Sequence, residues 1–234
     1  MDPALRQIID RIRAAAAAGT PLRIRGGGTK DFYGERLVGE VLDTAPLAGI
    51  TSYEPSELVV TVRAGTPLAA LEAALADKGQ CLPFEPPHFA PGGTVGGMVA
   101  AGLSGPARAT AGSVRDYVLG LSMVNGRAEH LTFGGQVMKN VAGYDVSRLM
   151  AGSLGTLGLI TEVSLKVLPV APAEATLRFT LDEAGAIRHV DGRVLGQHAG
   201  IINRREHRVA VADGVRPLSE RRLLGGLVCA DLTF

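Results

Sequence analysis

The sequence predicts an α+β protein, because three kinds of local signal recur along its 234 residues. Apolar side chains repeat at helical spacing from Leu5 to Ile12 and again within "GTPLAALEAALADKG". The segment Leu58–Arg63, "LVVTVR", is β-branched and typical of a strand. Asn125-Gly126 lies between two alternating segments and is a strong signal for a hairpin. Helices packed on a sheet are what this combination favours.

The N-terminal part is expected to form a helix and two strands. Asp2-Pro3 supplies a cap and a first-turn residue for the helix. Leu22–Arg25 alternates as a half-buried strand does, and Glu40–Asp43 is expected to be its partner. A first subdomain would end near Leu47.

The middle of the chain is expected to add a helix between two strands. After the strand Leu58–Arg63, Thr66 is the expected N-cap and Pro67 the first residue of a helix over Pro67–Lys78. Gly79 would lie just beyond its end, and "QCLPFEP" would be a short strand.

The remaining elements follow the same local rules. A hairpin is expected from Val118–Val124 and Ala128–Phe133, joined by a two-residue turn at Asn125-Gly126. The last expected elements are a short helix at Asp145–Met150, a strand at Ile160–Leu168, and a strand at Thr176–Leu181 that leads into a helix.

Composition excludes several classes of function. The formal net charge of +1 and the lack of a basic stripe argue against nucleic-acid binding. No apolar run is long enough to span a bilayer, and the N-terminus lacks a secretory signal, so we expect a cytoplasmic protein. The two cysteines are too few for a disulfide framework. His189, His198 and His207 are spaced nine residues apart, which matches no compact ligand motif, so no metal site is expected.

Glycine is the compositional deviation that points to a function. The chain has 31 glycines, and they gather in loops next to apolar strands. The first cluster, Gly26 to Lys30, follows the strand Leu22–Arg25, and its successive amides could surround a phosphate, with Lys30 adding charge. The P-loop spacing is absent and a Rossmann fingerprint fits poorly. A phosphate cradle and a plain wide turn are therefore equal alternatives on this segment alone.

The second cluster, "PHFAPGGTVGGMVAAGLSG", offers bare backbone against which a flat ligand could lie. His88 is its one candidate acid or base, and a structural or solvent-facing role is favoured for it. Val95, Val99 and Leu103 are expected in the core. A third loop is expected over Gly152–Gly158.

Three segments carry a family resemblance. "RIRGGGTKDFYG", "PGGTVGGMVAAGLSGPARATAGSVRDYVLG" and "KNVAGYDVSRLMAGSLGTLGLITEVSLKVLP", in this order, resemble the FAD-binding (PCMH-type) domain of the vanillyl-alcohol oxidase superfamily, and within it the glycolate oxidase branch. The resemblance covers about residues 1–181. It implies an FAD-binding domain over residues 1–172, made of α+β subdomains at about 1–47 and 48–172. It also implies that residues 173–234 are a truncated or divergent start of a cap domain.

The resemblance also implies site residues. The pyrophosphate of FAD would lie on the first loop and on Pro91–Gly97, the flavin and ribityl chain on Ala101–Gly105, and the adenosine half near Gly112–Asp116. The cofactor-binding residues so implied are Gly26, Gly27, Gly28, Thr29, Lys30, Pro91, Gly92, Gly93, Thr94, Val95, Gly96, Gly97, Ala101, Gly102, Ser104, Gly105, Gly112, Ser113, Asp116, Gly155, Gly158 and Ile160.

Departures from the family pattern refine the expectation. Members that attach flavin covalently often have a histidine where this chain has Thr29, and no cysteine lies near the second loop, so we expect dissociable FAD. No catalytic residue is predicted, since family members take their acid or base from a cap domain that has no recognisable counterpart after His189.

The resemblance implies an FAD-dependent oxidoreductase subunit. It would support oxidation of glycolate or a related 2-hydroxy acid, in a complex with a second flavoprotein subunit and an iron–sulfur subunit that takes the electrons. The complex would be cytoplasmic or peripheral to the inner membrane through its partners. The alternative is a non-catalytic FAD-binding or assembly subunit whose partner flavoprotein carries out the oxidation. A flavin-free nucleotide binder needs only the first loop and leaves the other two unexplained. A cell-wall precursor reductase that uses NADPH shares the domain plan, but its substrate groups are not found in this sequence.

Overall fold

The structure is a computed structural model and describes residues 2–34, 36–135, 144–172, 176–181, 208–211 and 228–233. These residues fall into two compact units, one of residues 1–105 and 113–170 and the other of residues 106–112 and 171–234. The first unit contains all three glycine loops. The domain and subdomain boundaries drawn from the sequence remain predictions.

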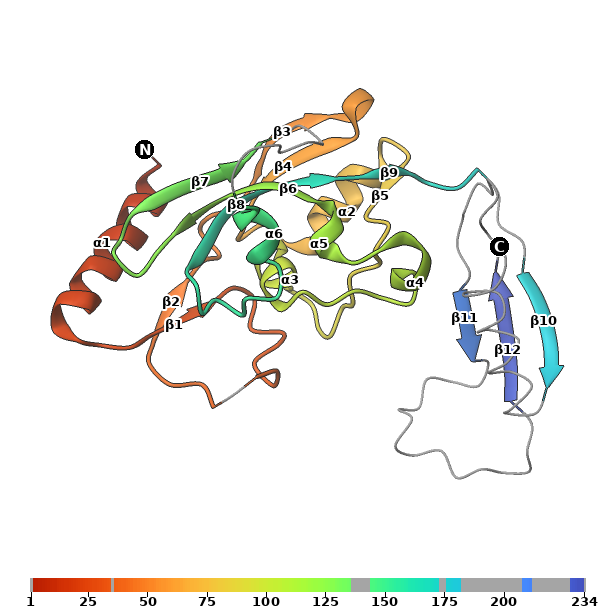
Figure 1. Ribbon diagram of the computed structural model, residues 1–234, viewed down its shortest axis with the longest axis horizontal. Helices are drawn as coiled ribbons and strands as arrows, with labels where there is room; N and C mark the ends of the chain where they lie inside the picture. Colours follow the sequence, from red (N-terminus) through yellow and green to blue (C-terminus); the bar gives the residue numbers. More distant parts are fainter. Residues whose placement is uncertain are drawn as a thin grey trace. The chain divides into compact units, whose positions relative to one another are not determined.

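A five-stranded antiparallel sheet with strand order β3-β4-β8-β6-β7 is the centre of the first unit (Figure 1). On one face of the sheet, Val60 of β4 stands opposite Leu165 of β8, and both are buried. The strands are β3 (Ile50–Glu54), β4 (Val59–Arg63), β6 (Val118–Val124), β7 (His130–Gly134) and β8 (Leu159–Lys166).

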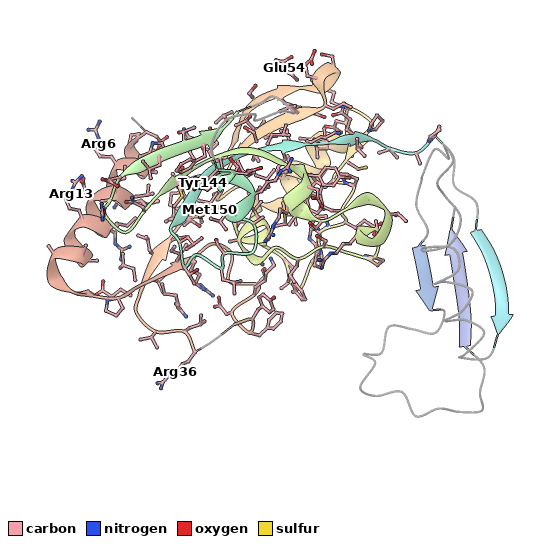
Figure 2. The ribbon with its side chains drawn as sticks, viewed as in Figure 1. Arg6, Arg13, Arg36, Glu54, Tyr144 and Met150 are labelled. Atoms are coloured by element: carbon pink, nitrogen blue, oxygen red, sulfur yellow. The ribbon has the colours of Figure 1, made fainter. Side chains whose placement is uncertain are left out.

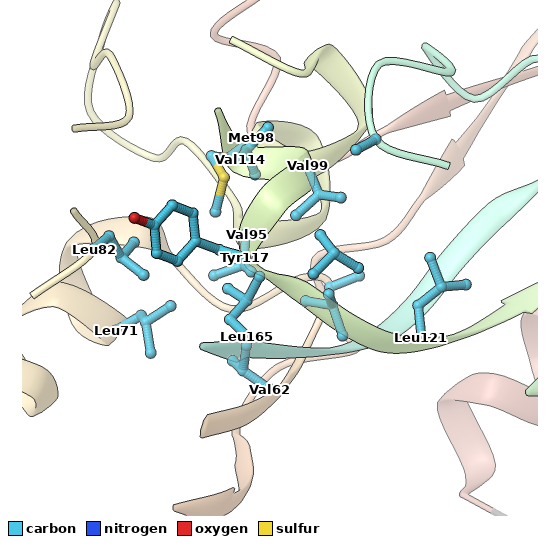
Figure 3. Packing of buried hydrophobic residues seen from close by; sticks show 14 of the residues in the cluster. Val62, Leu71, Leu82, Val95, Met98, Val99, Val114, Tyr117, Leu121 and Leu165 are labelled. Carbon is cyan, nitrogen blue, oxygen red and sulfur yellow. The ribbon is translucent and has the colours of Figure 1, made fainter. Parts of the chain in front are cut away.

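Helices α2 (Leu68–Ala76), α3 (Val95–Ala101) and α5 (Val114–Tyr117) contribute to the main core on this apolar face (Figure 3). Phe84, from the connection that follows β5 (Gln80–Cys81), is fully buried and its ring lies 5.5 Å from that of Tyr117. The short strand β5 pairs with β9 (Leu168–Pro169). The predicted core positions Val95 and Val99 are fully buried, whereas Leu103 is half-buried.

A smaller core joins the N-terminal elements to one end of the sheet. Helix α1 (Pro3–Ala18) begins at Asp2, whose carboxylate accepts from the Ala4 amide at 2.8 Å, as the Asp-Pro pair predicted. Its isoleucines pack against β2 (Glu40–Asp43) and against Val124 and Leu159. Strand β2 pairs in parallel with β1 (Leu22–Arg25), and both strands have the predicted bounds.

Two turn predictions are wrong in detail. Thr66 does not cap α2, because its hydroxyl bonds the amide and carbonyl of Gly49, and Pro67 is the N-cap residue. The hairpin loop runs over residues 125–129 instead of two residues. The Asn125 side chain accepts from the amides of Arg127 and Glu129, and Ala128 takes the left-handed conformation, with φ 61°.

The second glycine cluster differs most from the sequence expectation. Residues Val95–Ala101 are the helix α3 instead of a loop, with Thr94 as N-cap and Gly102 as a left-handed C-cap. Helix α6 (Val146–Leu149) lies within the range predicted for a short helix, and Asp145 caps it.

The second unit contains α4 (Arg108–Ala111) and an antiparallel sheet of order β10-β12-β11, formed by Thr176–Leu181, Val228–Thr233 and Arg208–Val211. The strand predicted at Thr176–Leu181 is confirmed. The helix expected after it and all three spaced histidines lie outside the described residues. Within the described ranges no helix is both long and apolar enough to cross a bilayer.

Candidate functional site

The first and second glycine loops touch backbone to backbone. The first loop, Gly26–Asp31, follows β1, and the second loop, Pro91–Thr94, leads into α3. A Cβ on Gly27 would overlap the carbonyl oxygen of Gly92, and a Cβ on Gly26 would overlap the Thr94 hydroxyl. Only glycine allows so close an approach, so these two positions hold the loops together.

The second loop is fixed on its other side to the start of α2. The Leu68 amide donates to the Gly93 carbonyl at 2.7 Å, and the Val95 amide donates to the Thr66 carbonyl at 2.9 Å. The third loop, Gly152–Gly158, contacts both β1 and α3. A Cβ on Gly155 would lie 3.2 Å from Ile24 of β1, and the Leu154 amide donates to the Ala100 carbonyl at 2.9 Å. All three loops therefore meet near the end of β1.

Two runs of backbone amides in these touching loops have no acceptor among the described residues. The first run is Gly26 to Lys30 and the second is Gly92 to Thr94. Backbone N–H groups away from secondary structure are normally paired with protein or water, so a run of unpaired donors is a place where an anion can bind. Donors that converge from two touching loops are what a phosphate cradle requires.

Lys30 adds a positive charge beside these amides. Burial lowers the pKa of Lys30, and its ammonium lies 5.8 Å from the centre of the Phe89 ring. It has no carboxylate partner in the described part of the chain. The Phe89 ring in turn lies edge-on to Phe32 at 5.1 Å, so an aromatic pair links the segment after the first loop to the segment before the second.

Other predicted site glycines and Val95 serve internal packing. The Val95 and Gly96 amides donate to the carbonyls of Thr66 and Ala64, and the Gly97 amide donates to the Thr94 hydroxyl. A Cβ on Gly102 would lie 2.8 Å from Gly152, and a Cβ on Gly105 would overlap the Glu85 carbonyl. These glycines let α3 and its C-terminal segment pack closely against neighbouring backbone, and Ala101 is buried with them.

The predicted polar residues after α3 are bonded to one another or to nearby backbone. Ser104 accepts from the Val114 amide at 3.0 Å. Asp116 and Ser113 form a capping box at the start of α5, in which the Asp116 carboxylate accepts from the Ser113 amide at 2.8 Å. This hydrogen bond is the largest cause of the lowered pKa of Asp116. Gly112 belongs to the other unit, where it ends α4 with φ 96°.

The predicted residues of the third loop have mainly structural surroundings. A Cβ on Gly158 would overlap the Met123 side chain, and Ile160 is buried in the main core. The sequence did not predict a role for Ser153 in this loop. The Ser153 hydroxyl is buried and has no hydrogen-bond partner among the described residues. The sequence also did not predict the ion pair between Arg25 and Asp31, 3.0 Å long, which spans the first loop. No local sequence pattern signals either feature.

The candidate acid–base groups near the loops are already paired. His88 contacts Glu72 of α2 at 3.0 Å, and Asp31 is bonded to Arg25. Among the described residues no group of three or more His, Cys, Asp or Glu side chains could hold a metal ion. The site can therefore bind an anion through backbone amides and a lysine.

Comparison with known families and proteins shows what the chain as a whole is similar to. Residues 5–148 match the family described as "FAD binding domain". The glycolate oxidase subunit GlcE of Escherichia coli is 52% identical over 179 residues, 76% of this chain and 51% of that protein. The glycolate oxidase subunit GlcD of Bacillus subtilis is 33% identical over 159 residues, 67% of this chain and 34% of that protein.

The fold is also found among solved structures. An alkyldihydroxyacetonephosphate synthase aligns with a TM-score of 0.64 at 22% identity, covering 80% of this chain and 34% of that one. This likeness confirms the α+β fold expected from the sequence. The chain spans about half or less of the length of the relatives described here.

Proposed function

The chain belongs to the FAD binding domain family, and we propose that its first and second glycine loops hold the pyrophosphate of FAD. The observation that carries this proposal is the pair of unpaired amide runs, Gly26–Lys30 and Gly92–Thr94, in two loops that touch at Gly27 and Gly92. A pyrophosphate carries negative oxygens along a short bridge, which suits donors that converge from two sides.

Lys30 would supply the charge that the amides lack. An ammonium group that is half removed from water and has no carboxylate partner in the described chain gains most from an anion nearby. The remaining residues implied by the resemblance extend this site. Ala101–Gly105 would lie toward the ribityl chain, and Ser113 and Asp116 toward the adenosine half. Gly155 would close around the cofactor, whereas Gly158 and Ile160 would support the third loop from the core.

We further propose that FAD binds without a covalent bond. Thr29 stands in the first loop at the position where covalently flavinylated relatives often have histidine, and a threonine hydroxyl is a poor flavin nucleophile. The described part of the second loop likewise has no thiol or imidazole between Pro91 and Thr94.

The activity supported best is that of an FAD-binding subunit in a glycolate oxidase type of complex. Glycolate or a related 2-hydroxy acid would be oxidised, and electrons would pass to an iron–sulfur partner. The likeness to GlcE and GlcD supports this assignment. When bound, the isoalloxazine ring would supply the redox chemistry, while the protein supplies orientation and electrostatics. The complex would be cytoplasmic or attached to the inner membrane through partners.

A second candidate function is a subunit that binds FAD but does not itself oxidise the substrate. The observation that favours it is that the two touching loops present backbone amides and Lys30, a donor set that suits anion binding rather than proton abstraction. In that case the partner flavoprotein would carry out the oxidation.

The visible spectrum of the purified 234-residue chain tests both proposals. The chain is mixed with FAD, passed through gel filtration, and then either precipitated with acid or treated with glycolate. Flavin that co-elutes and is released by acid is the expected result for dissociable FAD. If glycolate bleaches the flavin absorbance, the dehydrogenase role is favoured. If the flavin stays oxidised after glycolate is added, the non-catalytic role is favoured. Failure to retain flavin even in excess FAD would refute the cofactor assignment.

A further inference from the structure

The Arg25 side chain crosses the base of the first glycine loop. Arg25 is the last residue of β1, and its carbonyl accepts from the Thr44 amide at 2.9 Å and from the Thr44 hydroxyl at 3.3 Å. Its main chain is therefore fixed at the end of the parallel strand pair. From there its Nε donates to Oδ2 of Asp31 at 3.0 Å, on the far side of the loop.

The loop folds directly over this guanidinium. Gly28 is left-handed, with φ 68°, and a Cβ at this position would overlap the Arg25 guanidinium group. The Asp31 amide donates to the Gly28 carbonyl at 3.3 Å, which closes a turn above the arginine. Arg25 and Asp31 thus enclose the five residues Gly26–Lys30 whose amides have no acceptor in the described chain.

We propose that Arg25 and Asp31 are positioning residues, which form a brace that fixes the first loop in its phosphate-binding conformation. This inference rests on the proposed function. The charge of Asp31 makes the role distinctive. A carboxylate next to a phosphate site opposes phosphate binding through its charge, and Asp31 also neutralises the nearby arginine. Its presence is accounted for if it holds Arg25 beneath Gly28, because a pre-organised loop loses less entropy when it binds its ligand.

The sign of one mutational effect therefore decides the question. Replacing Asp31 with Asn removes a negative charge from the site. If only charge matters, Asp31→Asn should bind FAD more tightly. Tighter binding is also expected if Arg25 contacts the phosphates directly, because the substitution would free Arg25 from its ion pair with Asp31. The brace instead predicts weaker binding, with a Kd for FAD at least about threefold higher than that of the unchanged chain.

The experiment measures the Kd for FAD by quenching of flavin fluorescence in the full chain and in Asp31→Asn, Asp31→Glu and Arg25→Lys. Lysine keeps the charge but lacks the planar fork, so Arg25→Lys should weaken binding as Asp31→Asn does. Asp31→Glu should recover most of the affinity. The thermal midpoint without FAD should stay close to that of the unchanged chain, because the pair is half-exposed.

A matched control is Asp10→Asn in α1. Asp10 pairs with Arg13 at 2.9 Å on the outer side of that helix, where Arg13 projects into solvent (Figure 2). This substitution removes the same charge from a similar pair and should leave the Kd for FAD unchanged. If Asp31→Asn binds FAD equally well or more tightly, the brace is refuted. If Asp31→Asn does not fold, Asp31→Glu takes its place together with Arg25→Lys, and an Arg25→Lys chain that binds FAD as tightly as the unchanged chain refutes the brace. If the unchanged chain binds no FAD, the proposed function fails instead.

Discussion

The contact between Gly27 and Gly92 gives the most direct test of the cradle. Replacing Gly27 with Ala would place a methyl group 2.5 Å from the Gly92 carbonyl carbon and overlapping its oxygen, whereas ordinary contacts begin at 3.4 Å. The carbonyl carbon alone would require the two loops to separate by roughly 1 Å, and the overlapping oxygen requires more. Both sides of the contact are backbone, so no side chain can rotate away.

The expected magnitudes follow from this overlap. Overpacking of this kind costs about 1–3 kcal/mol, and we expect the upper part of that range because the contact is rigid. For a protein of this size a loss of about 3 kcal/mol lowers the thermal midpoint by roughly 6–12 °C. Separation of the loops should also remove one or two hydrogen bonds to a charged phosphate, which raises the Kd for FAD by about 10- to 100-fold or more.

Differential scanning fluorimetry and an FAD titration measure the two effects. Gly126→Ala is the matched control, because a Cβ on Gly126 meets nothing within 4 Å and its φ is not positive. It should change neither the midpoint nor the Kd. A Gly27→Ala chain that melts and binds FAD as the unchanged chain does would refute the backbone contact between the loops and, with it, the shared cradle.

Three further predictions concern single side chains. Lys30→Met should weaken FAD binding about tenfold. Burial lowers the pKa of Lys30 below its ordinary value of 10.5, so the affinity of the unchanged chain for FAD should fall as pH rises through that lowered pKa. The affinity of Lys30→Met for FAD should not show this fall at alkaline pH. Asp2→Asn should lower the thermal midpoint at neutral pH, because Asp2 caps α1 and its hydrogen bond with Arg63 is the main cause of its lowered pKa. The stabilisation from Asp2 is present above the unfolded pKa of 3.8 and is lost as pH falls through the folded pKa. The melting curves of the two chains should therefore converge in acid, and a difference that stays constant with pH would contradict this role. Phe84→Ala should lower the free energy of unfolding by about 3–5 kcal/mol because Phe84 is fully buried. Phe89→Ala, at a side chain that is 46% exposed, should change the free energy of unfolding measured by chemical denaturation by no more than about 0.5 kcal/mol. Equal losses in the two variants would contradict the assigned packing.

The elements with strong local signals could be predicted from the sequence. Helix α1 is fixed by an Asp-Pro start and regularly spaced isoleucines, and the strands β1 and β2 have their expected bounds. In contrast, α3 contains two glycines in seven residues, which disfavour a helix by about 1 kcal/mol each. Tertiary packing overrides this cost, because Gly96 fits closely against Ala64.

The candidate site could be located from the sequence, but its internal organisation could not. Glycine clusters beside strands and a family resemblance indicated which loops to consider. The brace between Arg25 and Asp31 depends on the left-handed turn at Gly28, and the inter-loop contact depends on how β1 and α3 pack. Neither feature has a periodic signature, since both depend on three-dimensional proximity.

The touching of Gly27 and Gly92 also links cofactor affinity to the integrity of the whole first unit. These two glycines come from distant parts of the sequence, so the cradle exists only in the native state and a denatured chain would have no comparable affinity for the cofactor. Under the proposed function, free FAD at 100 times its Kd would raise the free energy of unfolding by about 2.7 kcal/mol. The cellular supply of flavin would then govern how much of this protein survives proteolysis, and growth with little riboflavin would deplete the subunit itself as well as its activity.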